Sequence, residues 1–136
     1  MNESEQTLSI IKPDAVERNL QDEIKNEFNK NGFVISKEKK INISKQEAEQ
    51  FYKVHETKPF YNDLCEYLSS GPIIVMSLQK KNAVLDNRKL MGTTNPKEAE
   101  KGTLREKYGI SIDKNSVHGS DSIENAKIEI DFFFKD

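Results

Sequence analysis

Thr7-Leu-Ser-Ile-Ile-Lys-Pro-Asp14 is an apolar run that ends in a lysine and a proline. The run predicts a strand from Thr7 to Ile11. Pro13 predicts a short helical turn directly after that strand, because proline is tolerated in the first turn of a helix. Lys12 is therefore expected at the end of a strand, where the chain turns into a helix.

The next segments continue the alternation of strand and helix. Two apolar residues four positions apart within Glu23 to Asn31 predict an amphipathic helix, which Gly32 closes. Asp22 directly precedes this helix, and aspartate is a good N-cap. The stretch from Phe33 to Ile43 predicts a second strand, which completes a strand, helix, strand unit.

The middle of the chain predicts a pair of helices, a strand and a further helix. Ser44 and Glu47 form the Ser-x-x-Glu pattern, which satisfies free backbone amides at the start of a helix. An apolar residue at every fourth position from Phe60 to Leu68 predicts the second helix. The apolar run from Ile73 to Leu78 is short enough for a central strand, and Ala83 to Met91 predicts a helix after it.

The regular pattern weakens in the last third of the chain. Gly92 to His118 is a long connection with a helical turn near Leu104 to Tyr108, and long connections of this sort are often functional. Ser122 to Ile130 predicts a last helix, followed by an aromatic anchor at Phe132 to Phe134. Alternating strands and helices indicate an α/β sandwich, although the pattern alone leaves the strand order open.

Size and composition favour one soluble domain that spans residues 1–136. The net charge of −2 and the mixing of lysines with glutamates give no overall attraction to nucleic acid, which is not an expected partner. The single cysteine, Cys65, is expected to be buried and cannot form an internal disulfide, which fits a reducing cytoplasm. No run approaches the roughly 20 apolar residues of a membrane helix, so we expect no membrane partner and no export signal.

One of the chain's two histidines lies in Asn115-Ser-Val-His-Gly-Ser-Asp121, beside glycine and small polar side chains. A neutral imidazole beside Gly119 can present a ring nitrogen to a small anionic electrophile, because glycine has no side chain that blocks the approach. We interpret His118 as a nucleophile on this basis. The alternative for an isolated histidine is a structural role, which is our interpretation of His55.

Phosphate transfer also needs cations that offset the charge on the moving group. Lys12, Arg88 and Arg105 are far apart in the sequence and could converge only through folding. Thr94 could donate to a phosphate oxygen or form a local turn. The sequence contains no Gly-x-x-x-x-Gly-Lys-Ser/Thr phosphate loop, which argues against a P-loop enzyme, and no cluster with the spacing of a metal site.

Several motifs, taken together and in order, resemble those of nucleoside diphosphate kinases. They are Ile10 to Asp14, Phe51 to His55, Ser70 to Pro72, Asn87 to Gly92, Gly102 to Arg105, Val117 to Asp121 and Phe132 to Phe134. The resemblance runs from Thr7 to Phe134. It implies a ferredoxin-like βαββαβ core with a four-stranded antiparallel sheet, to which the Ser44 to Ser69 helical pair is attached.

The resemblance also implies a ping-pong mechanism. His118 would attack the γ-phosphate of a nucleoside triphosphate through Nδ1, become phosphorylated, and pass the group to a nucleoside diphosphate. Glu129 matches the family's carboxylate that steadies the other ring nitrogen, and Ser120 matches a hydroxyl in the same network. Tyr52 matches a phenol near the reacting phosphate, and Lys12 belongs to the same catalytic set. Without the resemblance, core packing would be our interpretation of Tyr52.

The remaining matches imply a nucleotide site. Phe60 would offer a flat face to the base, with Leu64 and Ile112 completing an apolar sandwich. Asn115 and Lys12 match residues near the ribose hydroxyls. Recognition by stacking tolerates every base, so we expect purines and pyrimidines, ribose and deoxyribose, and a role in maintaining NTP and dNTP pools. The phosphates are assigned to Lys12, Arg88, Thr94 and Arg105.

A cofactor and partners follow from the same resemblance. Mg²⁺ is expected to arrive on the nucleotide, because this hard cation keeps several waters and binds substrate phosphates. Nucleoside di- and triphosphates are the expected partners, together with further copies of the chain in a tetramer or hexamer, with the hexamer favoured. Two positions depart from the family pattern. Asp22 stands where glycine is common, and the chain ends at Asp136, where many relatives continue with a tail that packs on a neighbouring subunit.

Two other classes of protein remain as alternatives. A nucleotide-sensing or partner-binding module could keep the same fold and use phosphohistidine only for regulation, although the intact cationic and histidine positions argue against lost catalysis. A helical phosphorelay domain would place its histidine within a helix, whereas Val117 to Gly119 predicts a strand or turn.

Overall fold

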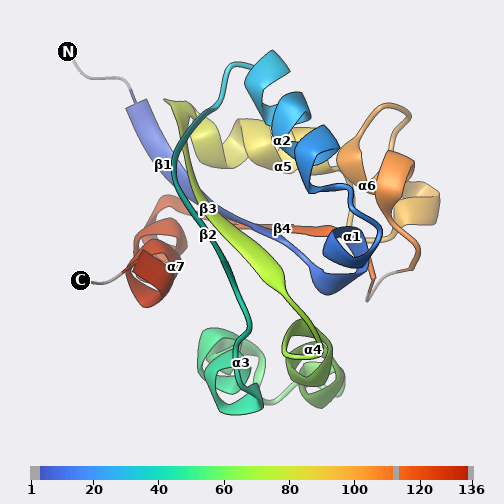
Figure 1. Ribbon diagram of the computed structural model, residues 1–136. Helices are drawn as coiled ribbons and strands as arrows, with labels where there is room; N and C mark the ends of the chain where they lie inside the picture. The colour runs from blue at the N-terminus through green and yellow to red at the C-terminus, as the bar shows by residue number, and fades with distance from the viewer. Residues whose placement is uncertain (1–3, 112–113, 135–136) are drawn as a thin grey trace.

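A computed structural model describes residues 4–111 and 114–134 of the protein (Figure 1). Its strands are β1 Ser4–Ile11, β2 Val34–Ile41, β3 Ile73–Lys81 and β4 Val117–Gly119. Its helices are α1 Pro13–Glu17, α2 Gln21–Lys30, α3 Lys45–Phe51, α4 Tyr61–Leu68, α5 Ala83–Met91, α6 Leu104–Tyr108 and α7 Ile123–Phe134. Two short 3-10 helices, η1 Lys53–His55 and η2 Pro96–Glu98, lie in the connections.

The strands form one sheet in the order β2-β3-β1-β4, and every neighbouring pair is antiparallel. The first strand of the chain therefore lies inside the sheet, with β3 on one side and the short β4 on the other. This order, with α2 between β1 and β2 and α5 between β3 and β4, is the ferredoxin-like βαββαβ arrangement. The predicted fold class and the attached pair α3 and α4 are confirmed.

Helices cover both faces of the sheet (Figure 1). On the α5 side, Ile11 and Ile74 pack with Phe28 of α2 and with residues of α5 and α6. On the α7 side, Leu8 and Ile10 pack with residues of α3, α4 and α7, and Cys65 is buried there as expected. Neighbouring residues of β1 enter different cores because side chains alternate along a strand. Because side chains alternate along β1 and β4, the position of a residue in either strand decides which face of the sheet its side chain occupies near His118.

Local signals in the sequence start two of the helices as predicted. Pro13 is in the first turn of α1, directly after Lys12. The Ser44 hydroxyl accepts a hydrogen bond of 3.1 Å from the Glu47 amide, and Glu47 Oε1 accepts one of 2.9 Å from the Ser44 amide, which completes the capping box of α3. Asp22 is not the N-cap of α2. That position belongs to Leu20, and Asp22 lies in the first turn, where its charge suits the positive end of the helix dipole.

Tertiary pairing extends several elements beyond their predicted ends. The pairing of β1 with β3 continues to Ser4 opposite Lys81, so both strands are longer than their apolar runs. Helix α7 continues to Phe134, and the predicted aromatic anchor forms its last turn. Helices α5 and α6 have the predicted bounds. The helical phosphorelay alternative is wrong, because His118 lies in β4.

Candidate active site

His118 pairs with Ile10 across β1 and β4, on the α7 side of the sheet. Its Nε2 atom lies 3.2 Å from Oε1 of Glu129 on α7. The Ser120 hydroxyl donates to the same Oε1 atom at 2.7 Å and accepts a hydrogen bond of 3.2 Å from the Leu8 amide. The strand pair and α7 therefore hold the imidazole in one orientation, and the fold brings together His118, Ser120 and Glu129.

The contact with Glu129 decides which nitrogen of His118 is available for chemistry. A carboxylate only accepts hydrogen bonds, so Nε2 carries the proton when the neutral imidazole donates to Glu129. Nδ1 then keeps its lone pair. Within residues 4–111 and 114–134 no hydrogen-bond partner reaches Nδ1, and 20% of the side chain is exposed. This orientation makes Nδ1 the nitrogen that can act as a nucleophile.

Aromatic side chains at the end of α3 pack against His118. The ring centroid of Phe51 is 5.2 Å from that of His118, and the centroid of Tyr52 is 6.4 Å away. Tyr52 is buried in the α7-side core and also lies beside the histidine. Burial, followed by the negative charge of Glu129, raises the pKa of Tyr52 above its usual range, so the phenol stays neutral. Phe51 was not among the predicted site residues, because its contact with His118 depends on the fold.

Two arginines and a threonine from distant segments line one cavity of about 370 Å³, namely Arg88 of α5, Thr94 and Arg105 of α6. Arg105 donates to the carbonyls of Gly92 at 3.0 Å and of Val117 at 2.9 Å. Burial, followed by the charge of Arg88, lowers the pKa of Arg105 to about 10, so the guanidinium is still charged at neutral pH. Two cations that repel each other in a partly buried cavity favour the binding of an anion.

Lys12 and Asn115 form a buried pair next to this cavity. Lys12 Nζ donates to Asn115 Oδ1 at 3.0 Å, and Asn115 Nδ2 donates to the carbonyl of Thr94 at 3.1 Å. Only 4% of Lys12 and 2% of Asn115 are exposed. The fold therefore brings together two predicted residues that come from opposite ends of the chain.

The predicted base-binding residues differ from one another in their exposure to solvent. Phe60 is 43% exposed at the start of α4, and its ring centroid lies 6.1 Å from that of His55. The ring centroid of His55 lies 6.2 Å from that of Tyr52, so neighbouring rings connect Phe60 with Tyr52, which lies beside His118. Leu64 is partly buried and packs against the α7-side core. Ile112 lies outside the described residues.

Gly119 has a packing role that the sequence did not predict. A Cβ atom at this position would lie 2.4 Å from Nδ2 of Asn87 and 2.7 Å from Cε of Met91, both on α5. Any side chain here would push α5 away from β4 and so disturb His118, the neighbouring residue. Asn87 is fully buried, and its amide has no hydrogen-bond partner among the described residues.

The donor chemistry of the site suits anions. In the part of the chain that the structure describes, no group of three or more His, Cys, Asp and Glu side chains could hold a metal ion. Across the same residues, no helix has the length and apolar character needed to cross a membrane. Arg88, Lys89 and Arg105 line the cavity together with one carboxylate, Glu100, so its lining carries a net positive charge.

The chain matches the family model described as "Nucleoside diphosphate kinase" over residues 5–136. It is 57% identical over 131 residues to the nucleoside diphosphate kinase of Campylobacter jejuni strain 81116, a match that covers 96% of each chain. It is 58% identical over 130 residues to that of Campylobacter lari, covering 96% of this chain and 95% of the relative. The crystal structure of the Aquifex aeolicus nucleoside diphosphate kinase matches with a TM-score of 0.95 at 37% identity, over 97% of this chain and 96% of that chain.

These matches confirm the family and the class of enzyme that the sequence motifs predicted. Enzymes of this class transfer a phosphoryl group between nucleoside triphosphates and nucleoside diphosphates, in general through a phosphohistidine. The chain belongs to the nucleoside diphosphate kinase family.

Proposed function

We propose that His118 carries the phosphoryl group in this protein. The observation that supports this role most directly is the bond between Nε2 and Glu129, which leaves Nδ1 with its lone pair. Nδ1 attacks the γ-phosphate, the bond from phosphorus to the bridging oxygen breaks, and the nucleoside diphosphate leaves. A second nucleoside diphosphate then takes the group from phosphohistidine in the reverse reaction. Glu129 and Ser120 keep the ring in place during both steps.

The cations and the phenol around His118 bind and orient the phosphates. Arg88 and Arg105 are charged and line the same cavity as Thr94, which supports a role for all three on the nucleotide phosphates. Lys12 supplies a compact charge from the end of β1, and the neutral Tyr52 can donate to the moving group. Each of these interactions strengthens as charge develops on the transferred oxygens.

Mg²⁺ enters with the substrate in this proposal. The arginines and lysine of the site would repel a free divalent cation and suit the phosphates that carry it. When bound, the metal ion neutralises part of the phosphate charge. The side chains of this protein would orient the nucleotide that carries the ion.

Broad nucleotide specificity follows from the exposed ring of Phe60. A base that stacks on this face, with Leu64 at its side and Ile112 proposed opposite, is held without hydrogen bonds to its edges. Lys12 and Asn115 are close enough to each other to bind the ribose hydroxyls together. The protein would then serve all common NTP and dNTP pools.

We also propose a homo-oligomer that works in the cytoplasm. The sheet leaves β2 at an edge, and Val34 at its start is 60% exposed, which suits pairing with a second copy. The buried thiol of Cys65 suits a reducing compartment. Sedimentation equilibrium of the purified protein distinguishes the preferred hexamer from a tetramer, and a monomer would contradict the proposal.

The mechanism is tested by labelling. Wild-type protein, His118→Ala and the matched histidine control His55→Ala are incubated with γ-labelled ATP and Mg²⁺, and unlabelled GDP is then added. We expect acid-labile label on the wild type and on His55→Ala, discharge into GTP, and no label on His118→Ala. Label that stays on the wild-type protein after GDP is added would favour the regulatory alternative. Label on His118→Ala would overturn the assignment of the nucleophile.

A further inference from the structure

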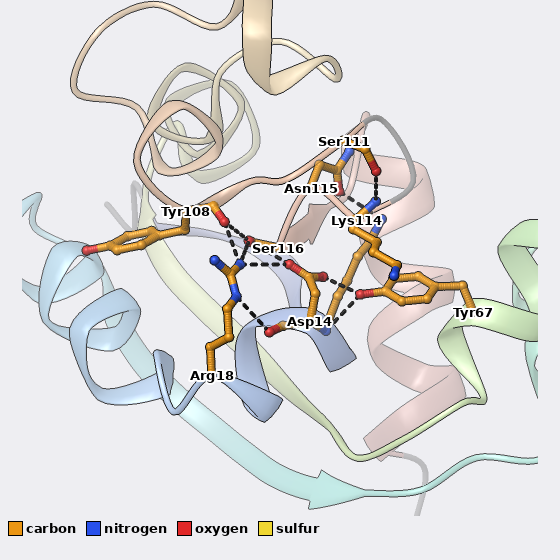
Figure 2. A network of polar contacts seen from close by, with 9 residues as sticks. Asp14, Arg18, Tyr67, Tyr108, Ser111, Lys114, Asn115 and Ser116 are labelled. Atoms are coloured by element: carbon orange, nitrogen blue, oxygen red, sulfur yellow. Dashed lines mark hydrogen bonds and ion pairs between the residues drawn. The ribbon is translucent and has the colours of Figure 1, made fainter.

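Asp14 lies in the first turn of α1, and only 3% of its side chain is exposed. Figure 2 shows its carboxylate at the centre of a polar network. Oδ1 accepts a hydrogen bond of 2.5 Å from the Tyr67 hydroxyl, which itself accepts one of 2.7 Å from the Asp14 amide. Oδ2 accepts from the Ser116 hydroxyl at 2.9 Å and from Arg18 at 3.1 Å. One carboxylate therefore joins α1, α4 and the segment that enters β4.

Ser116 is the member of this network with an unusual backbone. Its φ is +76°, in the left-handed region that residues other than glycine seldom adopt. Its hydroxyl also lies 2.9 Å from the carbonyl of Tyr108 and accepts a hydrogen bond of 3.2 Å from Arg18. Its own carbonyl accepts a hydrogen bond of 2.8 Å from the Lys12 amide. The contacts of the Ser116 side chain thus stabilise a turn that is bonded directly to the backbone of Lys12.

This turn sets the relative position of two proposed substrate-binding residues. Asn115 immediately precedes Ser116, and its Oδ1 accepts the hydrogen bond of 3.0 Å from Lys12 Nζ. The two side chains come from positions 103 residues apart, so they meet only where the end of β1 and the entry to β4 are held together. Asp14 holds that junction, because it lies two residues after Lys12 and bonds the residue next to Asn115.

We propose that Asp14, held by Tyr67, is a positioning residue that sets the Lys12–Asn115 pair against the ribose hydroxyls of the nucleotide. The inference rests on the roles proposed above for Lys12 and Asn115. Tyr67 lies near the end of α4, the helix that Phe60 begins. The bond between Tyr67 and Asp14 therefore also ties the base-stacking helix to the ribose end of the site.

Tyr67 offers a mild way to open the network. Burial, followed by the hydrogen bond to Asp14, raises the pKa of Tyr67 above its usual range, so the hydroxyl stays protonated and donates. Tyr67→Phe removes this hydroxyl and keeps the ring. Tyr61→Phe is the matched control on the same helix, because its hydroxyl donates to the carbonyl of Glu49 at 2.9 Å, outside the network.

The experiment measures how fast phosphorylated protein discharges into GDP and into 2′,3′-dideoxy-GDP. We expect Tyr67→Phe to lower kcat/KM for GDP about three- to tenfold and to leave the value for the dideoxy acceptor within about twofold of wild type. Tyr61→Phe should keep the wild-type ratio of the two values. In an Asn115→Ala background, Tyr67→Phe should no longer change that ratio, because the two substitutions remove the same interaction.

The acceptor ratio separates positioning from a general loss of stability. An equal loss on both acceptors in Tyr67→Phe would overturn the inference, since a weakened fold does not distinguish hydroxyls on the substrate. Ser116→Ala breaks the network from the other side and should give the same selective loss; a wild-type ratio there would also overturn it. Wild-type protein that is labelled but uses both acceptors equally would refute the ribose contact of Lys12 and Asn115, and the positioning role with it. Wild-type protein that takes no label would refute the proposed function itself.

Discussion

The end of the site proposed for the phosphates and the ribose, called the phosphate end below, differs from the proposed base end in how firmly its side chains are held. At the phosphate end Lys12, Asn115 and Ser120 are 4%, 2% and 0% exposed, and each makes hydrogen bonds to side chains of other elements. At the base end Phe60 is 43% exposed and contacts the ring of His55. The buried end has many partners with fixed geometry, and the exposed end has one flat apolar face.

This difference matches what each end of a nucleotide requires. Phosphoryl transfer gains from donors that are already in place, because they need no reorganisation when charge develops. Bases differ in their edges and share their flat faces, so a single exposed ring binds them with little discrimination. We therefore expect substitutions at the phosphate end to affect the rate of the reaction and substitutions at the base end to affect affinity.

The largest effect is expected at the nucleophile. His118→Ala removes the proposed nucleophile, and kcat should fall at least about 1000-fold. Nucleotide binding, measured by calorimetry, should persist because the arginines and Phe60 remain. Retention of a tenth or more of wild-type turnover would show that the phosphoryl group passes directly between nucleotides. The phosphate end would then not control the rate through His118.

Arg105 is expected to give the next largest effect. Arg105→Ala removes a partly buried cation from the cavity proposed to hold the phosphates, and kcat/KM should fall about 100-fold. The two hydrogen bonds to the carbonyls of Gly92 and Val117 are also lost, so the melting temperature should drop. Lys107→Ala is the control on the same helix, because Lys107 forms a surface ion pair with Glu27. Equal kinetic losses in the two variants would assign the effect to α6 rather than to the cation.

Ser120 tests how much the hydrogen bonds behind His118 stabilise the fold. Ser120→Ala leaves the Leu8 amide without its hydroxyl acceptor and removes a donor to Glu129, so the free energy of unfolding should fall by about 2 kcal/mol. Urea denaturation measures this change. Asn125, in the first turn of α7, donates its side-chain amide to Asp121 at 2.6 Å on the exposed side, and Asn125→Ala should cost less than half as much. Similar losses would mean that burial of the Ser120 network adds nothing.

Most of the fold could be predicted from local patterns. The capping box at Ser44, the proline after Lys12 and the bounds of α5 depend on neighbouring residues, and they are confirmed. The ends of β1 and of α7 depend on tertiary pairing, and their predicted bounds were short. Asp22 was assigned to the wrong helical position, because the Leu20 carbonyl accepts the first helical hydrogen bond, from the Ile24 amide, and α2 therefore starts at Gln21.

The candidate site was predicted mainly from the resemblance to family motifs. Spacing and composition were not enough, because they do not show which side chains meet in the fold. The cations at Arg88 and Arg105 converge as expected. The network of Asp14, Tyr67 and Ser116 was not predicted, because a left-handed serine and a buried carboxylate leave no periodic signal. Such contacts depend on three-dimensional proximity between elements that are distant in the chain.

Phe60 should give the smallest effect and the clearest contrast with the phosphate end. Phe60→Ala removes the stacking face, and because that ring is partly exposed the loss should be about fivefold in KM for every nucleotide, at the low end of stacking energies. Initial rates with ADP, GDP, CDP and UDP as acceptors measure it, and kcat should change little, since stacking is equally strong before and during transfer. Phe60→Tyr keeps the face and should retain wild-type KM values. A loss confined to one base would show that the base end recognises base edges by hydrogen bonding. The contrast between a rigidly held phosphate end and a base end that accepts every base would then no longer hold.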